Sequence, residues 1–238
     1  GVAADERSTS LLSDTDRALG FAVRLVDEAL DEVGLYMVHH NRWVLSARDN
    51  DAGLRLAREM RPLVGPLSPL VARFFPARQV RRLPYLFSVA PPAAATWSDL
   101  PLRLRPPARR GFPPTHALLD QAFGELLAAI EPVLAGRPYL FGERFTLGDA
   151  SLYGELGMNL ADPGAWALIN RRAPATARWV ERLAAGDFSA HRAGGVLTLD
   201  ATVAPLLDWI GRVFVPLMQQ NHTAWTNHRE RGEMLFNE

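Results

Sequence analysis

The segment from Arg137 to Leu152, RPYLFGERFTLGDASL, constrains the fold more than any other part of this sequence. A YLFG turn leads to Thr146, and Asp149 follows three residues later at the start of an apolar run. This spacing predicts a capping box: Thr146 accepts a hydrogen bond from the N–H of Asp149, and the Asp149 carboxylate accepts one from the N–H of Thr146. Two of the four unpaired N–H groups of a helix start are then satisfied. We expect this pair to be structural and to begin a buried helix.

Apolar residues recur at helical spacing along most of the chain. No strand alternation and no strand–helix–strand unit can be recognised, so the sequence predicts an all-α fold. The expected helices, starting with one long amphipathic helix, span about 14–45, 51–60 (stopping before Pro62), 63–75, 115–134, 147–160, 163–169, 174–183 and 201–229.

Prolines are concentrated in residues 84–114, which hold eight of the eighteen in the chain. Because proline lacks an N–H and fixes φ, this stretch excludes regular helix. We expect a long proline-rich loop inside a single helical domain of residues 14–238. Residues 1–13 are small and polar, and we expect them to form a flexible tail.

Composition excludes several classes of function. The net charge is zero and there are no cysteines, so neither a general attraction to nucleic acid nor a thiolate metal site is expected. All 26 basic residues are arginine, which excludes a lysine Schiff base. No apolar run approaches the ~18 residues of a membrane span. We therefore expect a cytoplasmic protein with no metal, nucleic-acid or membrane partner.

The turn and capped helix resemble the core helix of the C-terminal domain of glutathione S-transferases. A second likeness lies in Ala173-Pro174, Trp179-Val180 and Arg182-Leu183, which resemble the family's next helices, and together the similarity covers residues 115–185. The residues that carry the first likeness are Tyr139, Leu140, Gly142, Phe145, Thr146, Leu147, Asp149, Ala150, Ser151 and Leu152.

The resemblance implies a protein that conjugates glutathione, as a co-substrate, to small electrophilic or apolar compounds. In that family a thioredoxin-like domain precedes the helices, binds glutathione and activates its thiol. Only about 13 residues precede the first expected helix here, too few for a domain of ~50 residues. We therefore expect a fragment of a longer protein, with no catalytic residue of its own and no activity alone. The alternatives are a non-enzymatic interaction or scaffold module and a helical binder of apolar ligands.

Tyr36, His40 and Trp43 lie at positions i, i+4 and i+7, on one face of the first expected helix. A hydroxyl, an imidazole and an indole suit an amphipathic pocket, and the resemblance implies that this helix lines the co-substrate cleft. We take these three as candidate substrate-binding residues. Core packing or a subunit contact in a homodimer is the alternative, because the same face continues through Val26 and Val33.

Overall fold

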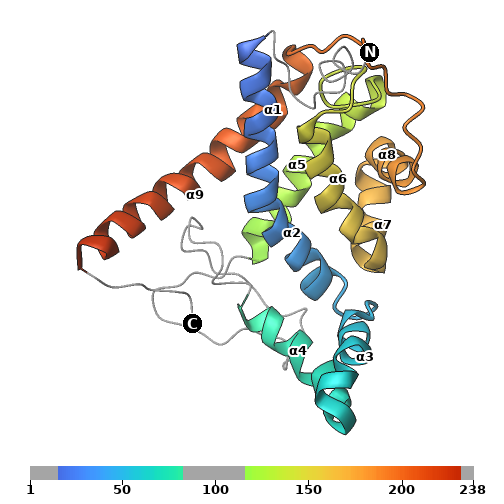
Figure 1. Ribbon diagram of the computed structural model, residues 1–238, viewed down its shortest axis with the longest axis vertical. Coiled ribbons are helices and arrows are strands. Elements are labelled where there is room, and N and C mark those ends of the chain that lie inside the picture. The colour runs from blue at the N-terminus through green and yellow to red at the C-terminus, as the bar shows by residue number, and fades with distance from the viewer. Residues whose placement is uncertain (1–15, 83–115, 232–238) are drawn as a thin grey trace, which may run out of the picture.

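The computed structural model describes residues 16–82 and 116–231, and within these ranges the fold is all-α, as predicted (Figure 1). The only β pairing among them is two isolated bridges, Tyr139 with Gly142 and Gly142 with Leu197. The expected flexible tail and proline-rich loop lie outside the described residues. The sequence also predicts a cap for the first helix near Ser13 or Asp14; both residues lie outside the described ones, and Asp16 caps the helix.

The first helix is continuous over residues 17–45 but changes its winding twice. Asp16 caps its start by accepting hydrogen bonds from the N–H groups of Ala18 and Leu19. Two five-residue π-helical segments interrupt the α-helical hydrogen bonding, and each shifts the helical phase. In order, the four parts are α1 (Arg17–Ala29), η1 (Leu30–Gly34), α2 (Leu35–His40) and η2 (Asn41–Leu45).

A helical hairpin follows and projects away from the rest of the molecule (Figure 1). It consists of α3 (Ala52–Val64), a 3₁₀ turn η3 (Gly65–Leu67) and α4 (Ser68–Arg82), which pack on each other. Gly65 adopts φ +56°, a conformation that favours glycine, where the chain leaves α3. We define residues 52–82 as the hairpin.

The prediction that the helix stops before Pro62 is wrong, because α3 continues through Pro62 to Val64. Proline removes one helical hydrogen bond, to the carbonyl of Arg58 four residues earlier. Both Arg58 and Pro62 are exposed, so water can hydrate that carbonyl. The expected helix over 63–75 likewise begins later, at Ser68.

The remaining helices form a bundle around one large apolar core. α1 packs against α6, and α5 packs against α8 and α9. Trp209 of α9 is fully buried and donates its Nε1–H to the carbonyl of Ala122 in α5 at 3.0 Å. The elements are α5 (His116–Gly136), α6 (Leu147–Gly157), η6 (Met158–Ala161), α7 (Pro163–Arg172), α8 (Pro174–Ala184), η7 (Ala201–Val203) and α9 (Ala204–Arg231).

Helix α8 takes its N-terminal cap from another helix. Ala173 occupies the cap position and has no side chain that could accept a hydrogen bond. Glu131 of α5 instead accepts from the N–H groups of Ala175 and Thr176 at 2.8 and 2.9 Å, and from the Thr176 hydroxyl at 2.8 Å. The carboxylate also complements the positive end of the helix dipole.

Among the described residues, one helical stretch, 201–227, is long and apolar enough to cross a membrane by length and composition. The expectation that no such stretch exists is wrong by this measure. About 33% of this apolar stretch is buried inside the fold, including Trp209 and Ile210 in the core between the helices. Core helices pass the same test, so this property is weak grounds for a membrane span.

Candidate functional site

The Thr146–Asp149 pair lies in the interior, where it joins the turn to the start of α6. The capping box is present, and the Asp149 carboxylate accepts from the N–H of Thr146 at 2.9 Å. The same carboxylate accepts from the Thr146 hydroxyl at 2.6 Å and from the N–H of Leu140 at 2.8 Å. Burial raises the pKa of Asp149 to about 6, although these donors, and Arg137, lower it. The pair therefore orders the turn as well as the helix.

The end of the first helix is fixed to the segment that begins α7. Arg42 donates its Nε–H to both oxygens of Asp162, at 2.9 and 3.2 Å, and the Asp162 carboxylate is fully buried. Ser46 accepts from the N–H of Ala165 at 2.8 Å and so caps α7. Burial raises the pKa of Asp162, while the nearby Arg42 and Arg55 lower it. This network holds one side of η2 rigidly against the bundle.

The other side of η2 faces a cavity of about 520 Å³ between η2, α3 and α4. Trp43 and Phe75 form its aromatic part and meet edge to face, with ring centroids 5.7 Å apart. The cavity volume is typical of sites for small molecules. Aromatic, aliphatic and charged groups share the lining, which comprises His39, Arg42, Trp43, Ala52, Arg55, Leu56, Glu59, Phe75 and Gln79. We refer to it as the Trp43 cavity.

The structure does not bring the three sequence-predicted substrate-binding residues together in this cavity. Trp43 lines it, whereas Tyr36 packs partly buried against the large core. His40 is 2% exposed, and burial lowers its pKa to about 4, so it is neutral near pH 7. The π-helical segment 41–45 breaks the regular 3.6-residue spacing on which the shared face depended. A role for Tyr36 and His40 in ligand binding stays a prediction.

Comparison with known families gives one match: residues 119–187 match the family described as glutathione S-transferase, C-terminal domain. This segment is similar to glutathione S-transferase C-terminal domains. Comparisons with curated proteins and with solved structures give no match. The matched segment comprises most of α5 together with α6, α7 and α8, and contains the capping box.

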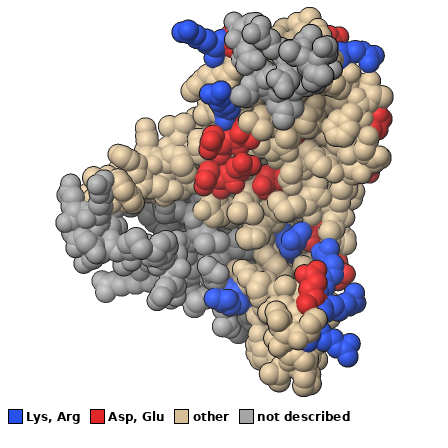
Figure 2. Space-filling model, in the orientation of Figure 1, with Lys and Arg blue, Asp and Glu red and all other residues tan. Residues whose placement is uncertain are grey.

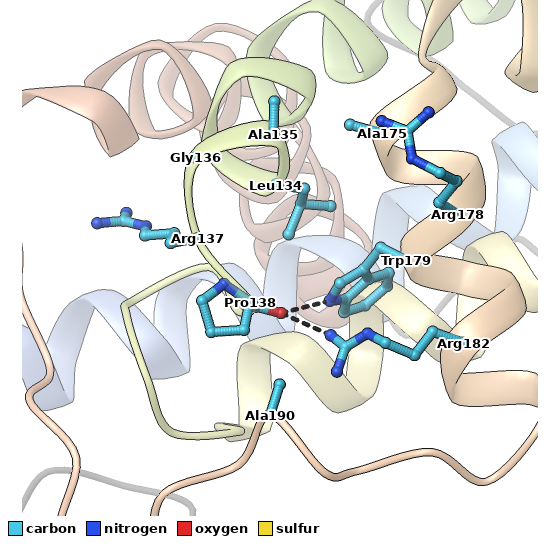
Figure 3. Close-up of a pocket in the computed structure, with 10 residues that line it drawn as sticks. All are labelled: Leu134, Ala135, Gly136, Arg137, Pro138, Ala175, Arg178, Trp179, Arg182 and Ala190. Atoms are coloured by element: carbon cyan, nitrogen blue, oxygen red, sulfur yellow. Dashed lines mark hydrogen bonds between the residues drawn. The ribbon is translucent and has the colours of Figure 1, made fainter.

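The second family motif of this glutathione S-transferase-like segment supports the same turn as the first. Trp179 and Arg182 of α8 both donate to the carbonyl of Pro138, each at 2.9 Å (Figure 3). The Arg182 guanidinium also lies over the Tyr139 ring, 5.1 Å from its centroid. Figure 3 shows the two side chains converging from α8 on the turn. Both motifs are therefore structural: they hold residues 138–142 between α5 and α6.

The Trp43 cavity lies outside the segment that matches the glutathione S-transferase family. Its walls come from η2 and the hairpin, which sequence patterns identified as helical without placing them side by side. Arg55, Glu59, Phe75 and Gln79 were missed for that reason. Their only sequence signal was an aromatic residue and charged residues on two consecutive amphipathic helices.

Within the described residues, no group of three or more histidine, aspartate or glutamate side chains is placed to hold a metal ion. Arg42 and Arg55 already pair with carboxylates, Arg42 with Asp162 and Arg55 with Asp51 at 2.8 Å. The cavity therefore offers aromatic surface with polar groups at its edge, an arrangement suited to binding.

Proposed function

We propose that this chain is the ligand-binding helical part of a glutathione S-transferase-like protein and that it takes a small aromatic compound in the Trp43 cavity. The observation that carries the proposal is the presence, in one chain, of a segment similar to the glutathione S-transferase C-terminal domain and of a pocket of small-molecule size beside the first helix of the chain. Conjugation of glutathione would need a thioredoxin-like domain to bind the tripeptide and ionise its thiol. In this proposal the chain supplies the surface that binds the second substrate. The protein would act in the cytoplasm.

The lining favours a planar apolar ligand with an anionic or polar edge. The indole of Trp43 and the ring of Phe75 offer two aromatic surfaces at a steep angle. Arg55 is partly exposed at the cavity and pairs with Asp51, a bond exposed enough to reorganise around a ligand. Glu59 is exposed and would disfavour a negative ligand edge on its own side.

The probe for this proposal is 8-anilinonaphthalene-1-sulfonate, an aromatic anion whose fluorescence rises in apolar sites. The substitution Trp43→Phe keeps the cavity apolar but removes part of its aromatic surface, so we expect affinity to fall about two- to tenfold. We expect Arg55→Met to weaken binding and Glu59→Gln to strengthen it. The matched control is Trp225→Phe, an exposed tryptophan on α9 away from the cavity.

Unchanged affinity in all three cavity variants would show that the probe binds elsewhere and would remove the ligand-binding role. A separate assay addresses activity: we expect no conjugation of glutathione to an aryl halide by this chain alone. Turnover by the chain alone would contradict the proposal that glutathione binding and thiol activation need a thioredoxin-like domain.

The alternative is a non-enzymatic interaction module, favoured by one observation: the hairpin exposes more large apolar side chains than a small-molecule binder needs. Self-association into a homodimer also stays a prediction. Sedimentation of the chain at several concentrations would measure it directly.

A further inference from the structure

The tip of the hairpin presents large apolar side chains to solvent. Leu63 is 84% exposed, Leu67 59% and Phe74 60%, and Leu54 and Leu70 are also exposed. They come from α3, η3 and α4, and Leu54 also lines a hollow of about 920 Å³ between these elements. An exposed apolar patch of this kind normally marks an interaction surface.

The residues around this tip are rich in arginine and poor in acidic side chains. Residues 60–82 contain no aspartate or glutamate, although the whole chain is neutral. Arg58, Arg61, Arg73 and Arg78 are exposed, and within the described part of the chain none of them forms an ion pair with an acid. The nearest acid in sequence, Glu59, is the one exposed carboxylate on the described part of the hairpin.

Leu63 and Leu67 lie at the turn of the hairpin, and Arg58 and Arg61 lie earlier on α3. Figure 2 shows the lower end of the molecule, the hairpin tip, as an uncharged surface, with arginine side chains and some acidic ones on the flanks above it. This is the order of groups that inserts apolar side chains below lipid headgroups while basic side chains stay at the phosphate level. Arginine also keeps its charge and can pair with phosphate through two hydrogen bonds.

We propose that the hairpin tip docks on an anionic phospholipid surface, with Leu63 and Leu67 entering the acyl boundary and Arg58, Arg61 and Arg73 contacting phosphates. Composition alone predicts no membrane partner, because the net charge of the whole chain is zero and does not reveal the basic hairpin. Arginines that have no acidic partner within the described residues complement the negative charge of such a surface. The inference is independent of the ligand site at Trp43.

The experiment is co-sedimentation of the full 238-residue chain with vesicles of phosphatidylcholine, with or without an equal part of phosphatidylglycerol. We expect binding to the anionic vesicles, weakening with added salt, and little binding to the neutral ones. Each arginine near an anionic surface is worth about fivefold in affinity, so Arg58→Gln/Arg61→Gln/Arg73→Gln should weaken binding more than tenfold. Leu63→Ser/Leu67→Ser should weaken it on any anionic vesicle, at all salt concentrations.

Matched control variants distinguish binding through the tip from nonspecific binding through other exposed side chains. Val196→Ser/Leu199→Ser removes two exposed apolar side chains elsewhere, and Arg24→Gln/Arg171→Gln/Arg178→Gln removes the same charge elsewhere. All these positions are partly or fully exposed, so circular dichroism should show unchanged helix content.

Retained binding in the controls together with loss in the tip variants supports the proposal. Absence of binding by the wild-type chain at low salt, or equal losses in tip and control variants, overturns it. Self-association abolished by the leucine substitutions without vesicles would assign the tip to a second copy of the chain instead, and would also overturn it.

Discussion

Removal of the Asp149 carboxylate should destabilise this fold far more than removal of an ordinary helix cap. Asp149→Ala deprives two buried backbone N–H groups, those of Leu140 and Thr146, of their acceptor. A buried unsatisfied donor costs about 1–3 kcal/mol, so we expect a loss of about 2–6 kcal/mol in the free energy of unfolding. For a domain of this size that corresponds to a fall in melting temperature of at least about 4 °C.

The exposed cap of α1 provides the matched comparison. Asp16 also accepts two backbone N–H groups, but in solvent, where water can replace it. Asp16→Ala should therefore cost only about 0.5–2 kcal/mol. Both variants are measured by urea unfolding near pH 8, because burial raises the pKa of Asp149 to about 6 and the carboxylate must be ionised.

A competing effect has the opposite sign, and Asp149→Asn separates the two. Burial of a carboxylate is costly, and an uncharged amide relieves that cost. The amide has only one acceptor oxygen, however, so its NH₂ group would face a donor of Thr146 or of Leu140 that the carboxylate now accepts from. If hydrogen bonding dominates, Asp149→Asn is less stable than the wild type and more stable than Asp149→Ala. An amide variant more stable than wild type, or an alanine variant no worse than Asp16→Ala, would refute the reasoning.

Two further predictions concern the contact between η1 and α6. A Cβ at Gly34 would lie 2.6 Å from Cγ of Glu155, so Gly34→Ala should destabilise by about 1–3 kcal/mol, whereas Gly154→Ala, which meets open space, should stabilise by up to about 1 kcal/mol in the same urea assay. Burial and Asp31 raise the pKa of Glu155 from 4.5 to about 7. Its neutral form is thus favoured in the fold, and wild-type stability should fall as pH rises through 7. Glu155→Gln cannot ionise and should gain stability relative to wild type between pH 5 and pH 8; a constant difference would contradict this.

Local signals in the sequence were sufficient for the C-terminal helices. The capping pair at Thr146 begins α6, and Pro163 and Pro174 begin α7 and α8, so each start carries a sequence signal within its first turn. The helix-forming pattern of α5 was equally clear, although Pro132 lies inside that helix.

Features that depend on distant contacts could not be read in the same way. The π-helical segments of the first helix leave no mark in the apolar spacing, yet they decide that Trp43 faces the hairpin while Tyr36 faces the bundle. The exposure that lets α3 pass through Pro62 is also a property of the folded hairpin. The cavity could therefore not be predicted from the sequence, although one of its lining residues, Trp43, was predicted as a binding residue.

The cap that α5 supplies to α8 makes the start of α8 depend on a residue more than forty positions earlier in the sequence. Pro174 marks the start of α8, but residues 173–184 supply no side-chain cap for it, so a copy excised or grafted elsewhere would fray at its first turn unless Glu131 came with it. Any redesign or recombination of this protein should therefore keep α5 and α8 from the same parent.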